Sequence, residues 1–127
     1  MQTAKRMILP LILLLGTTAA GAEDKEITVK LTVPDAAWII AIDEVHKVGK
    51  ELWVIAVVSR NPEMVGAQVI STVQASLKLA TPDLPMKYFV IGKTWNWENS
   101  EPYTFFRDMK EIQKMLRSGK LIYKAGK

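Results

Sequence analysis

Two neighbouring segments, Trp38–His46 and Leu52–Ser59, carry apolar residues on both of the faces that a β-strand presents. In the second segment every position from 52 to 58 is apolar. A strand with one face in water would alternate apolar and polar residues, so both segments need cover on both faces. Gly49, in the short connection between them, suits a hairpin turn. The sequence therefore predicts a central hairpin with a further layer on each face, or with a partner on one of them.

Four other segments read as strands. Ile27–Val33 alternates strictly between apolar and polar residues, which indicates a half-buried strand. Val69–Leu79 also alternates, but its Ala, Gln, Leu and Lys residues would suit a helix as well. The β-branched residues from position 69 to 73 favour the strand. Met86–Ile91 is expected to form the next strand, and 121–123 a short closing strand.

One helix is expected late in the chain. Four large apolar residues recur at the spacing that forms the core-facing stripe of an amphipathic helix. Either Ser100 or Thr104 could be its N-cap, and Pro102 would suit a first turn that begins at Ser100. Gly119 can end the helix. The stripe consists of Phe105, Met109, Ile112 and Leu116.

These elements predict an α+β fold, with a mainly antiparallel sheet of five to six strands and one C-terminal amphipathic helix. A β-sandwich with an appended helix is the alternative.

The first 22 residues have the organisation of a secretory signal peptide. Lys5 and Arg6 are basic, residues 7–15 are almost entirely apolar, and small residues at positions 20 and 22 fit a cleavage site before Glu23. The apolar run is shorter than the roughly 20 residues that span a bilayer, which disfavours an uncleaved anchor. We therefore expect residues 1–22 to be a signal peptide and 23–127 a single globular domain, periplasmic or extracellular and without stable membrane insertion.

Composition excludes several classes of function. The chain has no cysteine, which rules out disulfides, thiol catalysis and zinc sites built from cysteine. The signal peptide contributes part of the net charge of +4, so residues 23–127 are only weakly basic and give no reason to expect nucleic acid as a partner. Cations predominate from Arg107 onwards; they could contact an acidic partner or an anionic membrane surface, although a solvated helix face is the simpler interpretation.

The motifs that suggest catalysis are incomplete. Gly92, Lys93 and Thr94 match the end of a phosphate-binding P-loop, but Lys87 occupies the position of its first glycine. The motif is better explained as a strand end with a glycine kink. No metal or other cofactor is expected.

His46 is the only histidine, and Asp43 or Glu44 could be its acidic partner in a hydrolase. Ser59 or Ser71 would then have to be the nucleophile, although neither lies in a Gly-x-Ser-x-Gly turn. Glu44 and His46 point the same way on a strand, but two ligands are too few for zinc.

The segment from Lys93 to Tyr103 is the most suggestive of binding. Trp95 and Trp97 share one side of an extended chain, with Tyr103 nearby, and such side chains dominate binding hot spots. They could instead cap the core beneath the helix, because tryptophan is usually well buried.

We therefore expect an exported, non-enzymatic binding or accessory module whose partner is another exported protein, with Trp95, Trp97 and Tyr103 as contact residues. A small-ligand or carbohydrate binder that uses the same aromatic residues is the first alternative. A hydrolase that uses His46 is the second.

Overall fold

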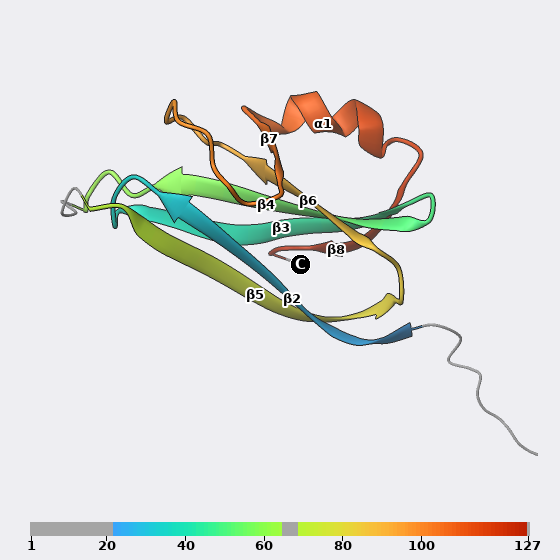
Figure 1. The fold of residues 1–127 in the computed structure, drawn as a ribbon. Helices are drawn as coiled ribbons and strands as arrows, with labels where there is room; N and C mark the ends of the chain where they lie inside the picture. The colour runs from blue at the N-terminus through green and yellow to red at the C-terminus, as the bar shows by residue number, and fades with distance from the viewer. Residues whose placement is uncertain (1–21, 65–68, 127) are drawn as a thin grey trace, which may run out of the picture. The chain divides into compact units, whose positions relative to one another are not determined.

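The computed structural model describes residues 22–64 and 69–126, which form seven strands and one helix (Figure 1). Residues 1–21 of the predicted signal peptide lie outside the described residues. The prediction of a mostly β chain with a single helix is confirmed. In chain order the elements are β2 (Ala22–Val33), β3 (Trp38–Val48), β4 (Glu51–Arg60), β5 (Ser71–Pro82), β6 (Met86–Ile91), β7 (Thr104–Phe106), α1 (Met109–Leu116) and β8 (Lys120–Lys124).

The described strands form two sheets, where the sequence predicts a single sheet, with a β-sandwich as the alternative. β2 pairs with β5, and the other five strands lie in the order β7-β6-β4-β3-β8. β3 is antiparallel to β4 and β8, whereas β6 is parallel to β4 and β7 is parallel to β6. The larger sheet is therefore mixed: the predicted antiparallel pairing holds for β3, β4 and β8, but not for β6 and β7. The reason is that the chain leaves β4, forms β5 in the other sheet, and re-enters beside β4 in the same direction.

The central hairpin has the burial that its double apolar pattern predicts. Along β4, residues 52–56 and Val58 are buried, so side chains on both faces of the strand are covered. Gly49 takes a φ of 61° in the turn between β3 and β4. One face of the sheet packs against α1 through a core that contains Trp53, Ile55, Phe89, Ile91, Ile112 and Leu116.

β2 and β5 also follow their sequence patterns. Ile27, Val29, Leu31 and Val33 are completely buried, while the residues between them are not. β5 is a strand and not the rival helix.

Contacts divide the described chain into two units. The smaller unit contains residues 22–26, the first residues of β2, and residues 78–83, which include the last residues of β5. Within it, Lys25 Nζ lies 2.7 Å from Asp83 Oδ1 and 3.2 Å from Glu23 Oε1. All remaining elements, including every residue of the site described below, belong to the larger unit.

The helix begins later than predicted. Asp108 is its N-cap, and neither Ser100 nor Thr104 has that role. The Asp108 carboxylate accepts a hydrogen bond from Lys110 N at 2.9 Å, and Glu111 Oε1 accepts one from Asp108 N at 3.2 Å. This reciprocal pair is a capping box, which satisfies N–H groups that the first turn leaves free. Phe105, predicted to lie on the helix, is part of β7 instead.

Candidate functional site

The segment from Gly92 to Phe106 consists of the loop that follows β6 and of β7, which is parallel to β6, and its two ends are joined at the base. Gly92 N donates a hydrogen bond to Phe106 O at 3.1 Å. Gly92 has a φ of 104°, and a Cβ atom added there would lie only 2.4 Å from Val58 O. Glycine is therefore required at this position on both conformational and steric grounds. Residues 92–95 form no helix, so the Gly-Lys-Thr sequence is a strand end with a glycine kink.

The far end of the loop is anchored to β2 by side chains. Asn99 Nδ2 donates to Thr32 O at 2.7 Å, and Glu101 Oε2 accepts from Thr32 N and Thr32 Oγ1 at 2.9 and 2.8 Å. Tyr103 Oη accepts from Lys30 N at 3.1 Å. Lys30 and Thr32 are two residues apart, so their backbone groups point to the same edge of β2. The loop side chains therefore take the place of a neighbouring strand along this edge.

Glu101 is the centre of this anchor. Burial by itself raises the pKa of its carboxyl group, but hydrogen bonds from Asn99 and Thr32 favour the charged form and hold the pKa below its ordinary value. The carboxylate is therefore ionised at neutral pH, and hydrogen bonds to an ionised acceptor are stronger than bonds between neutral groups.

Trp95 is held by the same network. Its Nε1 donates to Asn99 Oδ1 at 2.9 Å, and its ring meets Trp38 edge-on with centroids 4.9 Å apart. Trp97 lies against it, with ring centroids 5.6 Å apart. Both Trp95 and Trp97 are partly exposed. They are therefore neither fully buried in the core nor fully exposed to solvent. The predicted proximity of the two tryptophans is present in the structure.

Tyr103 lies on the other leg of the loop. Its ring packs against Tyr88 and Phe105, with centroids 5.5 and 6.4 Å away, and it is also partly exposed. It borders a shallow depression together with Lys93 and Phe105.

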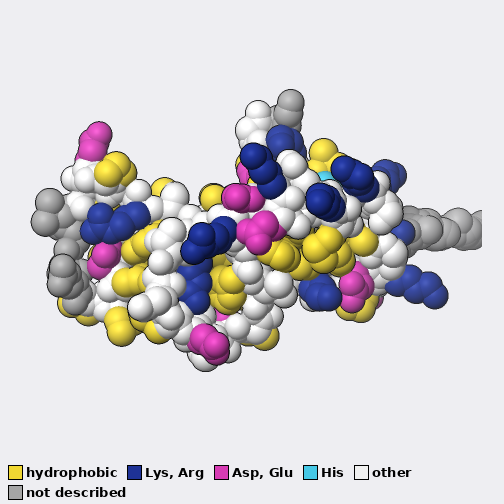
Figure 2. Space-filling model, turned by 90° about the horizontal axis from the view of Figure 1, so that it is seen from above, with side chains coloured by type: hydrophobic (Ala, Val, Ile, Leu, Met, Phe, Trp, Pro, Cys, Tyr) yellow, Lys and Arg dark blue, Asp and Glu magenta, His cyan; other side chains and the backbone are white. Residues whose placement is uncertain are grey.

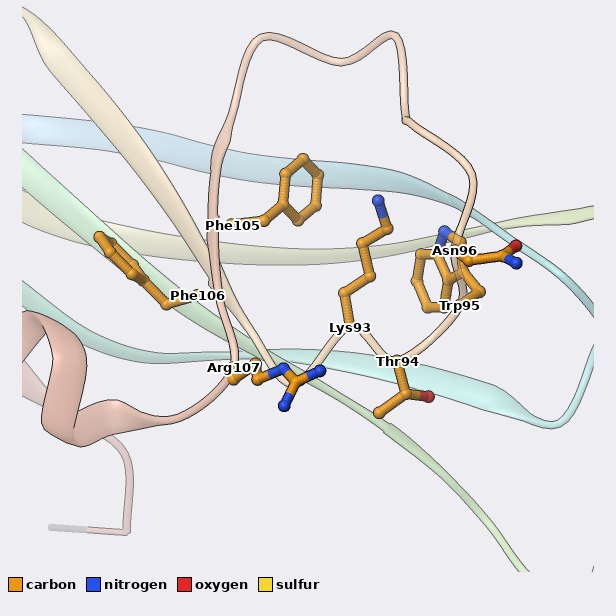
Figure 3. A pocket seen from close by; sticks show the side chains of 7 residues that line it. All are labelled: Lys93, Thr94, Trp95, Asn96, Phe105, Phe106 and Arg107. Carbon is orange, nitrogen blue, oxygen red and sulfur yellow. The ribbon is translucent and has the colours of Figure 1, made fainter.

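A hollow of about 670 Å³ opens between the two legs of the loop (Figure 3). Lys93 extends into it between two aromatic rings, and its Nζ lies 4.9 Å from the Phe105 centroid and 5.7 Å from that of Trp95. Arg107 borders the opposite side of the base. Of the three predicted contact residues, only Trp95 lines this hollow. Its lining consists of Lys93, Thr94, Trp95, Asn96, Phe105, Phe106 and Arg107.

Sequence reasoning missed Lys93, Phe105 and Arg107 as members of one site. The spacing of Phe105 from Met109 and Ile112 fits the helical period, so the sequence predicts a helix that already includes positions 105 to 107. The sequence does carry the signal that would have moved the helix start, namely Asp108 followed three residues later by Glu111. With the helix beginning at Met109, Phe105 falls within β7 and Arg107 directly follows that strand.

His46 lies in a separate cluster between β3 and β8. Its Nε2 is 2.6 Å from Glu44 Oε1, and Lys124 Nζ donates to Glu44 Oε2 at 3.1 Å. Burial raises the pKa of Glu44, but the hydrogen bonds from His46 and Lys124 prevail and lower it.

The strand register separates His46 from one of its candidate nucleophiles. His46 pairs with Trp53, whereas Ser59 pairs with Ile39, so Ser59 lies six residues further along β4, or ~20 Å away. Ser71 Oγ donates to Val69 O at 2.9 Å. Within residues 22–64 and 69–126, no three His, Asp or Glu side chains gather as a metal site would require.

The chain matches no protein-family model, and it shows no significant similarity to a curated protein or to a solved structure. In the part of the chain that the structure describes, no helix has the length and apolarity needed to cross a bilayer.

Proposed function

We propose that this chain is an exported, non-enzymatic binding module that contacts another exported protein through Trp95, Trp97 and Tyr103. The observation that carries the proposal is that all three residues are partly exposed and that hydrogen bonds hold Trp95 and Tyr103 in position. Trp95 is hydrogen-bonded through Asn99, and Tyr103 through Lys30 N. Aromatic side chains held in place before binding lose little conformational entropy when a partner arrives, which is how preorganised surfaces gain affinity.

The closed base of the loop supports the same proposal. The bond from Gly92 N to Phe106 O fixes the two legs, and the bonds of Asn99 and Glu101 to Thr32 fix the far end. Compact loops with adjacent ends, of roughly 6–16 residues, are frequently functional. A loop tied down at both ends presents its side chains in one arrangement.

The test is affinity capture from the exported proteins of the source cell, with identification by mass spectrometry. A partner captured by the wild-type protein is expected to be lost with the Trp95→Ala, Trp97→Ala double variant. Leu121→Ala is the matched control, because Leu121 is an exposed apolar residue of β8, outside the loop. Equal recovery by the double variant and the wild type would remove the two tryptophans from the proposal.

A small-ligand or carbohydrate binder is the second candidate, and the hollow between the loop legs favours it. Trp95 and Phe105 offer flat apolar surfaces there, and Thr94 and Asn96 offer hydrogen-bonding groups. Tryptophan fluorescence distinguishes the two candidates, because a sugar in the hollow would shift the emission of Trp95 in the absence of any protein partner.

Export is itself part of the proposal, and it is supported by the signal-like residues 1–22. Intact-mass measurement of protein isolated from its source is expected to show a chain that begins near Glu23. Native protein that retains Met1 would contradict export by cleavage.

A further inference from the structure

β5 has one long edge without a neighbouring strand. In the part of the chain that the structure describes, β5 is paired with β2 alone. It is 12 residues long, and its unpaired edge is a row of backbone N–H and C=O groups that a further strand can bind. The opposite edge of β2, by contrast, is bound by the loop side chains Asn99, Glu101 and Tyr103. The free edge of this two-stranded sheet is therefore that of β5.

The cross-strand contacts show which residues of β5 face this free edge. β2 and β5 run in opposite directions (Figure 1), and Thr28 Oγ1 lies 3.0 Å from Ser76 Oγ across the pair. The N–H groups of Lys30 and Thr32 point to the loop. Because every second residue of a strand points its backbone groups to the same edge, those of Thr28 also point away from β5. Those of Ser76 then point away from β2, so the even-numbered residues of β5 face the free edge.

The apolar row of β5 is only partly covered. The alternate apolar residues of Ile27–Val33 on β2 are completely buried, whereas Val73, Ala75 and Leu77 on β5 are only half-buried. β2 has a neighbour on each edge, but β5 has a neighbour on one edge alone. A further strand beside β5 would cover the open side of this row, and burial of apolar surface is the main favourable contribution to protein association.

The composition of this edge allows it to pair with an identical strand. Charged side chains are scattered over the face of the molecule seen in Figure 2. Natural sheet edges commonly carry charges or proline, which block the addition of a further strand. The stretch Ser71–Leu77 contains neither a charged residue nor a proline. Two copies of the chain can therefore meet here without placing like charges opposite each other.

The outer strands of the larger sheet are less suited to such self-pairing. These strands are β7 and β8, and β7 has only three residues. β8 begins with Lys120 and ends with Lys124. Antiparallel pairing of two β8 strands over their full length would place these lysines opposite each other, and directly opposed like charges are destabilising. Among the strands compared, β5 alone combines a long free edge with a charge-free stretch.

We propose that two copies of the chain associate through the edges of their β5 strands, in an antiparallel pair centred on Gln74. Gln74 is the middle residue of Ser71–Leu77, so this register pairs the whole charge-free stretch with its copy. Gln74 of one copy faces Gln74 of the other across a two-fold axis, and Thr72 faces Ser76. The backbone groups of these residues face the free edge and form the hydrogen bonds. The half-buried apolar rows of the two copies join on one face of a continuous sheet.

Cysteine cross-linking tests this register, because the chain contains no cysteine of its own. Gln74→Cys is expected to form a disulfide-linked dimer when a thiol oxidant is added to the purified protein. Opposed Cα atoms of a hydrogen-bonded antiparallel pair lie about 5.5 Å apart, which is within disulfide range. Thr72→Cys is the matched control, since Thr72 is also exposed on β5. The same register places the two copies of residue 72 roughly 14 Å apart, too far for a disulfide.

Sedimentation velocity tests the association without cysteine. The wild type is expected to form a reversible dimer as its concentration rises. Gln74→Pro is expected to abolish the dimer, because proline lacks the N–H group that faces the second copy, while the backbone groups that face β2 are kept. Circular dichroism checks that this variant is folded.

Charge reversal distinguishes a second copy from any other strand. Gln74→Lys and Gln74→Glu are each expected to weaken the dimer by up to about fivefold, because two like charges then face each other across the axis. A mixture of the two variants is expected to restore dimerisation, because opposite charges face each other in the mixed dimer. This result requires that residue 74 of one copy meets residue 74 of the other.

Several results would overturn the inference. These are a wild type that stays monomeric at about 1 mM, equal cross-linking of the two cysteine variants, and a mixture of Gln74→Lys and Gln74→Glu that dimerises no better than either alone. If the wild type is monomeric and folded Gln74→Pro no longer captures the partner protein, the edge binds a strand of that partner and the proposal of a second copy fails. The proposed function is tested separately, since Trp95→Ala, Trp97→Ala is expected to leave the dimer intact.

Discussion

Glu101 accepts two hydrogen bonds from Thr32, one from its backbone N–H at 2.9 Å and one from its hydroxyl at 2.8 Å. This single carboxylate ties the loop between β6 and β7 to the edge of β2, 69 residues earlier in the chain. It also accepts a bond from Asn99, the residue that positions the Trp95 indole. The orientation of the proposed contact surface therefore depends on an acidic side chain that itself is not expected to touch the partner.

Replacement of Glu101 by alanine is expected to destabilise the protein by about 1–3 kcal/mol, because it leaves partly buried donors on Thr32 and Asn99 without their acceptor. Urea unfolding at pH 7 measures the loss. Glu98→Ala is the control, since Glu98 is exposed, and it is expected to change stability by less than about 0.5 kcal/mol. Equal effects of the two substitutions would mean that the anchor contributes nothing to stability.

Stability is expected to fall in acid. The pKa values of Glu44 and Glu101 in the folded protein lie below the ordinary value of 4.5. A depressed carboxyl pKa stabilises the fold fully above the unfolded-state pKa, and this stabilisation is lost as the pH falls through the folded-state pKa. Unfolding free energies measured between pH 7 and pH 3 are expected to converge for the wild type and Glu101→Gln as the pH falls. A constant difference over this range would contradict the pKa assignment for Glu101.

The base of the loop is expected to tolerate no side chain. Gly92→Ala would place a Cβ atom 2.4 Å from Val58 O at a residue whose φ is 104°. The backbone must therefore move, and we expect the free energy of unfolding to fall by more than about 2 kcal/mol. Gly49→Ala is the matched comparison, because Gly49 also has a positive φ, of 61°, but nothing lies within 4 Å of the added atom. The Gly49→Ala variant is expected to lose only about 1–2 kcal/mol of stability, because alanine is disfavoured in the left-handed conformation. A smaller loss at Gly92 than at Gly49 would show that the close approach to Val58 is absent.

The true N-cap of α1 can be identified by substitution. Asp108→Ala is expected to destabilise the protein by about 0.5–2 kcal/mol, the usual effect of removing a cap. Ser100→Ala and Thr104→Ala are expected to have little effect, because Ser100 lies in the loop and Thr104 in β7. Thermal or urea unfolding of the three variants provides the measurement. A larger effect at Ser100 than at Asp108 would restore the helix start that periodicity alone suggested.

The sequence predicts the parts of this fold that local periodicity controls. The strict alternation of Ile27–Val33 identifies β2, and the uninterrupted apolar run at 52–58 identifies a strand with two covered faces. The order of the strands in the sheet, by contrast, does not follow from local periodicity. Nothing in Met86–Ile91 indicates that it pairs in parallel with β4, because pairing depends on where β5 takes the chain between them.

In the candidate site, too, local features could be predicted from the sequence, but contacts between distant residues could not. Trp95 and Trp97 are conspicuous in the sequence, and their rings do lie together. The approach of Lys93 and Arg107 to one hollow depends on closure of the loop by Gly92 and Phe106, and no local pattern reports it. Half-burial of Trp95 could not be predicted either, because its ring packs against Trp38, which is far from it in the sequence.

The central claim is that the anchored aromatic loop is the surface that binds another exported protein. The most direct test is the dissociation constant of the captured partner, once purified, for the wild type, for Trp95→Ala, Trp97→Ala and for Leu121→Ala, each checked for native folding by circular dichroism. Loss of two hot-spot residues, at about 2 kcal/mol each, predicts affinity weaker by a factor on the order of several hundred for the double variant, with Leu121→Ala unchanged. An unchanged dissociation constant for the folded double variant would contradict the account.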